Sequence, residues 1–170
     1  GYKYDGRQKV IAEALIKRYN LKSNAKILDV GCGKGFLLYE FQKLLPEATL
    51  YGYDLSKYAL AKAPDEIKSR LIHQLAQGSN PFPPNLIFDL VVSLGCLHNL
   101  KLPNLYKALH EIERIGKNKY IMVESYRNEQ EQFNLQCWAL TAETLLDNKS
   151  WEYLFNLFVY TGDYEFIYFE

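Results

Sequence analysis

The sequence predicts one α/β domain with a mostly parallel sheet and helices on both of its faces. Short apolar segments alternate with helical segments along the whole chain, which is the order that builds an open parallel sheet. The length of 170 residues, with 48% hydrophobic composition, suits a single domain with a substantial core. We therefore treat residues 1–170 as one domain.

Six segments have the length and composition of strands. The clearest is FDLVVSL at residues 88–94, an apolar run typical of a strand buried on both faces. The expected strands are residues 26–30, 49–54, 70–75, 88–94, 119–124 and 164–169.

Helices are expected between these strands, and several have recognisable ends. Ser56 and Ser150 are predicted N-caps, and Pro46 and Pro64 each end a helix. Pro103 suits a first helical turn. The expected helices are residues 10–19, 36–45, 57–63, 103–115, 141–146 and 151–158, and the proline-rich stretch 76–85 is expected to be a loop.

Composition argues against several classes of protein. Twenty basic residues balance twenty acidic ones, so we expect neither a nucleic-acid surface nor an anionic-membrane surface. There is no apolar run long enough to span a bilayer, and the start lacks the apolar core of a signal peptide. The three cysteines form no CxxC pair, which favours a reduced, cytoplasmic protein without a metal centre. The first residue is Gly rather than Met, so we expect that residues are missing before it.

The strongest motif is a glycine turn, GCGKG at residues 31–35, directly after the first strand. Glycines there permit a tight turn and a close approach of a ligand to the backbone. A dinucleotide fingerprint would need its third glycine at Phe36. A phosphate-binding P-loop would need GxxxxGK followed by Ser or Thr, and this motif is absent. Asp54 ends the next strand, where a carboxylate can accept hydrogen bonds from both ribose hydroxyls or, alternatively, only cap the next helix.

With ILDVGCGKG, then YGYDLS, then FDLVVSLGCLHNL, the chain resembles the class I S-adenosylmethionine (SAM)-dependent methyltransferases over about residues 10–124. The resemblance implies a Rossmann-like sheet of six to seven strands, SAM as cofactor and methyl transfer as the activity. It also implies that Asp54 holds the ribose and that Leu55 flanks the adenine. The cofactor-binding residues that we expect are Asp29, Gly31, Cys32, Gly33, Gly35, Asp54, Leu55, Gln77, Ser93 and Leu94.

The chain departs from the family pattern in two places. The acidic or amide residue that commonly contacts the adenine amino group falls near residues 76–77, so Gln77 or the backbone must take that role. The family usually ends in a sixth and a seventh strand, and only one such strand is visible here. We therefore expect the final antiparallel hairpin to be reduced.

No motif for a macromolecular acceptor follows the fourth strand. The proline-pair motif of exocyclic-amine DNA methyltransferases, the context of a cytosine-attacking cysteine, the paired glutamates of arginine methyltransferases and the clustered acids of a catechol-type metal site are all absent. These absences and the zero net charge favour a small polar metabolite, such as a sugar derivative. The alternatives are a SAM-binding protein without activity and an NAD-type oxidoreductase, against which Phe36 argues.

His98 is the candidate general base, because histidine is a common general base in enzymes and His98 follows the fourth strand. The alternative is that it only packs under the next helix. Residues 124–138 follow the fifth strand and have the position of a substrate-covering segment, or else of a solvated helix. Within that segment the expected substrate contacts, besides His98, are Glu124, Tyr126, Arg127 and Trp138.

Overall fold

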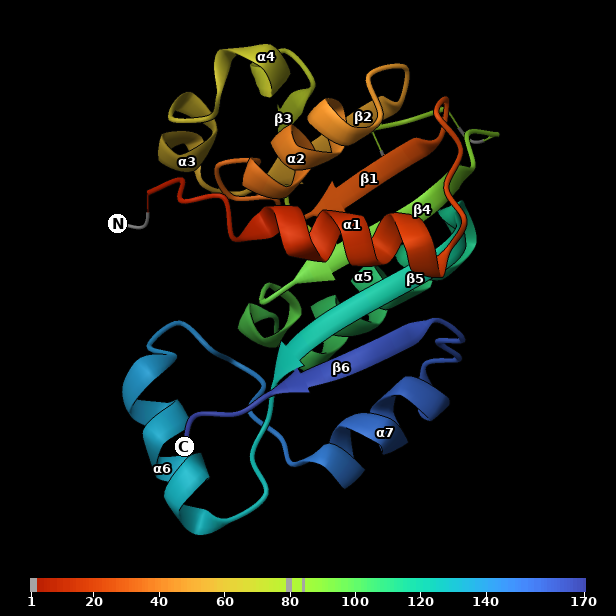
Figure 1. The fold of residues 1–170 in the computed structure, drawn as a ribbon. Coiled ribbons are helices and arrows are strands. Elements are labelled where there is room, and N and C mark those ends of the chain that lie inside the picture. The colour runs from red at the N-terminus through yellow and green to blue at the C-terminus, as the bar shows by residue number, and fades with distance from the viewer. Residues whose placement is uncertain (1–2, 79–80, 84) are drawn as a thin grey trace.

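The computed structural model describes residues 3–78, 81–83 and 85–170, and it shows six strands in the order β3-β2-β1-β4-β5-β6 (Figure 1). Every strand pairing among these residues is parallel. This confirms the predicted Rossmann-like sheet. The strands are β1 Lys26–Val30, β2 Thr49–Asp54, β3 Leu71–His73, β4 Phe88–Leu94, β5 Gly116–Glu124 and β6 Asp163–Ile167.

Helices and one 3₁₀ turn connect the strands. The predicted helix starting at Lys57 is confirmed, since Ser56 Oγ accepts a hydrogen bond from Ala59 N–H at 3.1 Å. The described helices are α1 Gln8–Arg18, α2 Phe36–Leu44, α3 Lys57–Ala61, α4 Asp65–Lys68, the 3₁₀ turn η1 Leu97–Asn99, α5 Leu102–Ile115, α6 Glu129–Trp138 and α7 Asn148–Leu157.

The strand order reverses at β1. The chain first runs outward from β1 to β3 and then returns to β4 on the other side of β1. The loops that follow β1 and β4 therefore diverge at the carboxyl edge of the sheet. In open α/β sheets this switch point is where ligands bind.

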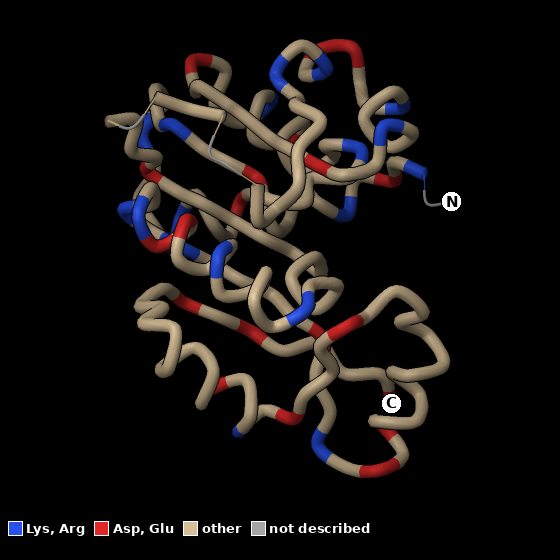
Figure 2. The backbone as a smooth tube through the Cα atoms, turned by 180° about the vertical axis from the view of Figure 1, so that it is seen from behind, with Lys and Arg blue, Asp and Glu red and all other residues tan. Residues whose placement is uncertain are grey.

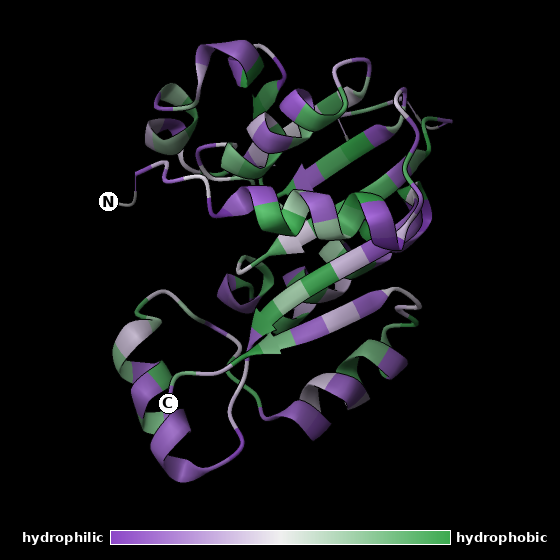
Figure 3. Ribbon diagram, viewed as in Figure 1, coloured by the Kyte–Doolittle hydropathy of each residue, from purple (hydrophilic) through white to green (hydrophobic). Residues whose placement is uncertain are grey.

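Two apolar layers sandwich the sheet. One buried cluster joins α1 and α2 to Ile27, Leu50 and Leu90, and the other joins α5 and α7 to Leu28 and Val91. Because neighbouring strand residues point to opposite faces, Ile27 and Leu28 belong to different layers. Hydrophobic residues are frequent in the middle of β1 and along β4 (Figure 3). The two clusters confirm the expected helices on both faces.

Two expectations for the C-terminal region were wrong. Residues 141–146 form a loop rather than a helix, because the backbone N–H groups of Glu143 and Thr144 both donate to the carbonyl of His98, at 3.0 and 2.9 Å. Helix α7 is capped by Asp147, whose carboxylate accepts from the backbone N–H of Ser150 at 2.7 Å. Ser150 therefore lies inside the helix.

The sheet ends differently from the usual family pattern. β6 lies directly beside β5 in parallel register, and the described residues contain no seventh strand or antiparallel hairpin. In the proline-rich stretch 76–85, residues 79, 80 and 84 lie outside the described residues, and the described remainder is without helix or strand, as predicted.

Replacing Phe155 by Ala tests the packing of α7 on the sheet. Phe155 is 2% exposed and packs its ring on Trp151 at a centroid distance of 5.6 Å. We expect Phe155→Ala to lower the free energy of unfolding by about 3–5 kcal/mol. The matched control Phe133→Ala, at a side chain that is 61% exposed, should change it by less than about 0.5 kcal/mol. Urea unfolding measures both, and equal losses would contradict this packing.

Candidate functional site: a cavity at the switch point

The glycine turn has a backbone that only glycine adopts without strain. Gly31, Gly33 and Gly35 have φ angles of 78°, 55° and 70°, in the left-handed region that side chains disfavour. A Cβ on Gly31 would overlap Cys96 Sγ. The turn is also anchored to the end of β2, because the N–H groups of Gly31 and Cys32 both donate to the carbonyl of Tyr53, at 2.9 and 3.1 Å.

Asp54 connects the glycine turn to the next helix. Its Oδ2 accepts from the backbone N–H of Gly33 at 2.8 Å, and its Oδ1 accepts from the backbone N–H of Ser56 at 2.7 Å. A carboxylate has about four lone-pair positions, so each oxygen keeps capacity for a further donor. Asp54 therefore caps the start of the next helix, as the alternative interpretation predicts, and keeps acceptor capacity for other donors. Its contact with a ribose stays a prediction.

A cavity of about 790 Å³ opens beside these two elements. This volume falls in the usual range of small-molecule sites, about 300–1,000 Å³. The lining residues among the expected cofactor contacts are Gly31, Gly33, Asp54, Leu55, Gln77 and Leu94. Segments from the loops after β1, β2 and β3 and from the ends of β2 and β4 therefore converge on one space. The contacts of these residues with a cofactor stay a prediction.

The remaining expected cofactor residues are not among those that line the cavity. Gly35 is the N-cap of α2 and has a left-handed backbone, and Cys32 is buried. Ser93 Oγ donates to the carbonyl of Val30 at 2.9 Å, which fixes β4 to β1. Their contact with a cofactor stays a prediction, because these residues do not line the cavity.

Asp29 is a buried carboxyl group at the end of β1. It is 4% exposed, and burial, followed by the nearby charge of Asp54, raises its pKa from 3.8 to about 7. Desolvation disfavours the charged form of a carboxyl group. Asp29 is also absent from the cavity lining, so its contact with the methionine part of SAM stays a prediction.

Gln77 has a hydrogen-bond acceptor atom without a partner. Its Oε1 is buried and makes no hydrogen bond within the described chain, although Gln77 lines the cavity. A buried polar atom without a partner costs free energy unless a ligand or water satisfies it. The orphaned oxygen fits a nucleoside cofactor that carries an amino group.

The outer side of the cavity was missed by sequence analysis. Thr141 Oγ1 donates to Asn99 Oδ1 at 2.7 Å and Thr144 Oγ1 donates to the carbonyl of Leu100 at 2.6 Å, so the loop between α6 and α7 folds back onto η1. The outer lining residues are Asn99, Leu100, Lys101, Asn104, Thr141 and Glu143. Local pattern could not predict these contacts, which join residues more than 40 positions apart.

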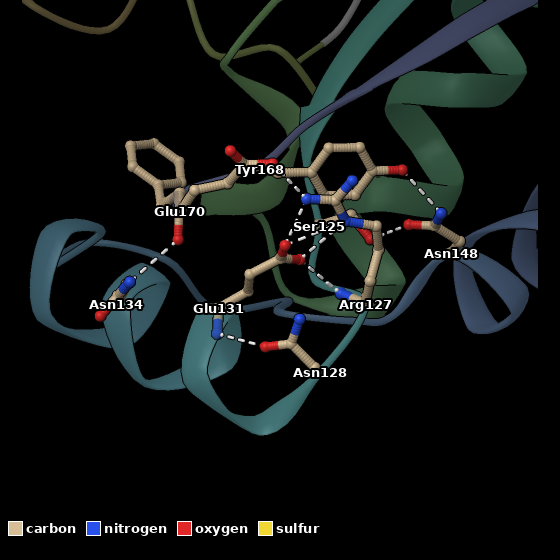
Figure 4. Close-up of polar contacts among 9 residues, drawn as sticks. Ser125, Arg127, Asn128, Glu131, Asn134, Asn148, Tyr168 and Glu170 are labelled. Carbon is tan, nitrogen blue, oxygen red and sulfur yellow. Dashed lines mark hydrogen bonds and ion pairs between the residues drawn. The ribbon is translucent and has the colours of Figure 1, made fainter.

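Arg127 is engaged by carboxylates of its own chain (Figure 4). Its Nε donates to Glu131 Oε1 at 2.9 Å, its Nη2 donates to Glu170 Oε1 at 2.6 Å, and its guanidinium lies 4.1 Å from the Tyr168 ring centroid. These contacts fix the start of α6 to the last residues of the described chain. A role of Arg127 in binding an anionic acceptor stays a prediction.

The other expected substrate contacts also lie outside this cavity. Trp138 packs on Phe169 at a ring-centroid distance of 4.5 Å, and Tyr126 forms an isolated bridge with Asp147. Nδ1 of His98 contacts Glu124 Oε2, and both side chains are about 95% or more buried. The roles of these residues in substrate binding therefore stay predictions as well.

Comparison with known proteins identifies the class of protein. A family model described as a methyltransferase domain matches residues 21–160. The malonyl-[acyl-carrier protein] O-methyltransferase of Halalkalibacterium halodurans is 38% identical over 114 residues, which are 59% of this chain and 42% of that protein. The chain spans less than half of the length of the curated relatives that it matches.

Solved structures share the fold. The YcgJ protein of Bacillus subtilis superimposes with a TM-score of 0.69 at 19% identity, covering 86% of this chain and 66% of that one. The plantazolicin methyltransferase BpumL, solved with a desmethyl-plantazolicin analogue and S-adenosylhomocysteine (SAH), gives a TM-score of 0.68 at 23% identity, covering 88% of this chain and 62% of that one. The chain belongs to the methyltransferase domain family and has the fold of its class I, SAM-dependent members.

The described residues contain neither a helix that could cross a membrane nor a group of side chains that could hold a metal ion. None of the described helices combines the length and the apolar composition needed to cross a bilayer. Within residues 3–78, 81–83 and 85–170, no group of three His, Cys, Asp or Glu side chains is arranged to hold a metal ion.

Replacing Asp54 by Ala tests the cofactor site. The change removes the acceptor of two backbone N–H groups and of the expected ribose hydroxyls. Hydrogen bonds to a charged group are worth roughly 1.5–3 kcal/mol each, so we expect SAH affinity to fall at least about tenfold. Isothermal titration calorimetry measures the SAH affinity. The control is Asp65→Ala, because the Asp65 carboxylate is exposed on α4. Unchanged affinity in Asp54→Ala would contradict the site.

Replacing Asp29 by Asn tests the buried carboxyl group. The folded chain holds this proton more tightly than the unfolded chain, because burial raises the pKa from 3.8 to about 7. The stability that this group contributes is therefore greatest below pH 3.8 and falls as the pH rises toward about 7. We expect the ligand-free Asn variant to gain stability relative to the wild type over that window. Urea unfolding at several pH values measures the difference in the free energy of unfolding between the variant and the wild type. A difference that does not change with pH would contradict the raised pKa of Asp29.

Proposed function

We propose that the protein transfers the methyl group of SAM to a small polar molecule. The observation that carries the proposal is the cavity beside the glycine turn, which combines Asp54 with the unpartnered Gln77 Oε1. SAM supplies an electrophilic methyl group when it is bound. The chain's own task is to orient the two ligands and to exclude water from them.

Each part of the cavity has a proposed role in holding the cofactor. The glycine turn lets the methionine part lie against the backbone, and Asp54 accepts hydrogen bonds from the ribose hydroxyls. Leu55 supplies an apolar surface for the adenine face, while Gln77 Oε1 accepts a hydrogen bond from the adenine amino group. The buried Asp29 lies behind the turn and favours the cationic amino group of the methionine part.

The small polar acceptor is supported by the cavity's outer side. Asn104, Lys101, Thr141 and Glu143 line it with amide, ammonium, hydroxyl and carboxylate groups. A hydroxyl-rich molecule such as a sugar derivative can satisfy such a mixed set. Basic and acidic residues are interspersed over the backbone (Figure 2), and the net charge is zero, so there is no broad basic field to attract a polyanion.

The cysteines support a reducing location for the protein. All three are free, and Cys137 is exposed. An exposed free thiol is typical of proteins in reducing compartments. We therefore propose that the protein acts in the cytoplasm.

Labelling from tritiated SAM tests the acceptor class. The protein is incubated with a cell extract separated by dialysis into a small-molecule fraction and a macromolecular fraction. We expect tritium to be transferred to the small-molecule fraction. Gly33→Val, which puts a side chain on a left-handed backbone position, is the inactive control.

Each other outcome has a defined meaning. Transfer only to macromolecules would reject the small acceptor in favour of a carrier-bound or peptide acceptor. No transfer to either fraction by a protein that binds SAH would favour the alternative of a SAM-binding protein without activity.

A further inference from the structure

We infer that the methyl acceptor is a zwitterion, a small molecule with one carboxylate and one ammonium group, and that Lys101 and Glu143 recognise these two charges. The inference rests on the proposed function and narrows its small polar acceptor to one charge type. Both residues act on the binding of the acceptor, and no step of the methyl transfer itself is assigned to them.

The cavity at the switch point contains few charges, and they are of both signs. The charged residues among its described lining are Asp54, Lys101 and Glu143. Asp54 already accepts hydrogen bonds from two backbone N–H groups, and it is the proposed ribose contact. Lys101 is therefore the only cation, and Glu143 the only further anion, that the described residues bring to this space.

Neither of these two charges is neutralised by the described part of the chain. Among its residues, Lys101 and Glu143 form no ion pair, with each other or with a third side chain. Both side chains are exposed. Further along α5, by contrast, Arg114 donates to Glu111 at 2.7 Å. The two charges at the cavity are thus available to a ligand.

The positions of Lys101 and Glu143 are fixed by the contact between η1 and the loop that joins α6 to α7. The backbone N–H of Glu143 donates to the carbonyl of His98 at 3.0 Å. Thr144, which is 4% exposed, donates from its Oγ1 to the carbonyl of Leu100 at 2.6 Å, directly before Lys101. The two charged side chains therefore extend from backbone segments that are held together, which reduces the cost of ordering them around a ligand.

This arrangement favours an acceptor with complementary charges. The Lys101 ammonium attracts a carboxylate, to which Asn104 in the same cavity wall can donate a further hydrogen bond. The Glu143 carboxylate attracts an ammonium group. A phosphate dianion would meet one cation and two carboxylates, those of Asp54 and Glu143, whereas a diamine would meet Lys101. A neutral sugar would satisfy neither charge, so a zwitterion fits the lining best.

Depletion of the acceptor by ion exchange tests its charge type. The small-molecule fraction of a cell extract is passed over a cation-exchange resin in acid, where a zwitterion becomes a cation, or over an anion-exchange resin in base, where it becomes an anion. Each flow-through is neutralised and incubated with the wild-type protein and tritiated SAM, and a fraction passed over uncharged resin is the control.

We expect either charged resin to remove the labelling that the control fraction supports. Labelling that survives the cation-exchange resin would show an acceptor without an ammonium group. Labelling that survives the anion-exchange resin would show an acceptor without a carboxylate. Either result would overturn the inference.

Two variants test the residues assigned to the charges. Lys101→Met and Glu143→Gln each remove one charge at an exposed position. We expect the amount of acceptor fraction needed for half-maximal labelling to rise at least about tenfold in each. The matched controls Lys107→Met and Glu152→Gln, at exposed residues outside the cavity lining, should leave it unchanged. An unchanged requirement in Lys101→Met or Glu143→Gln would contradict the assignment.

Calorimetry with SAH separates this inference from the proposed function. We expect Lys101→Met and Glu143→Gln to bind SAH as the wild type does, and a loss of about tenfold would assign the charges to the cofactor and overturn the inference. If the wild type labels nothing in the untreated small-molecule fraction, the proposed function fails and the inference fails with it. Labelling of that fraction that resists a charged resin rejects the zwitterion alone.

Discussion

The hydrogen bond from the backbone N–H of Gly33 to Asp54, 2.8 Å long, is the interaction on which the site depends. It joins the turn after β1 to the end of β2, and the second carboxylate oxygen joins the same residue to Ser56 at the start of α3. Loops that leave a parallel sheet are free to diverge, and a charged acceptor with two backbone donors removes much of that freedom. The left-handed glycines are what allow the turn to present its N–H group to this carboxylate.

From this junction the other walls follow in order along the sheet. Ser93 holds β4 to β1 through the Val30 carbonyl, which sets the position of Gly95 and Cys96 opposite the turn. The carbonyl of His98 then accepts hydrogen bonds from the loop between α6 and α7. The walls of the cavity are therefore joined by hydrogen bonds that each involve a backbone group, and the apolar layers pack beneath it.

The parts predicted correctly from the sequence are those determined by local chemistry. Apolar runs defined β1 and β4, and the spacing between the glycine turn and Asp54 placed the two elements that the structure joins. The cap of α7 was assigned wrongly because Asp147 and Ser150 are both good caps in the same stretch, and only the path of the preceding loop decides between them.

The structural features that the sequence did not predict depend on contacts between distant segments. Residues 141–146 have a helical pattern, but the carbonyl of His98 offers them hydrogen bonds that no local pattern contains. The partners of Arg127 could not be predicted from the sequence either, because they include Glu170, which is 43 positions away, and the role of Arg127 in binding an acceptor stays a prediction. The outer wall of the cavity and the environment of α6 required the folded chain.

A crystal structure of the protein with SAH tests the central claim most directly. The account predicts the ribose hydroxyls at Asp54, the amino acid part against the glycine turn and the adenine amino group at Gln77 Oε1. Density for SAH elsewhere on the molecule, or in the cavity with its ribose away from Asp54, would contradict it.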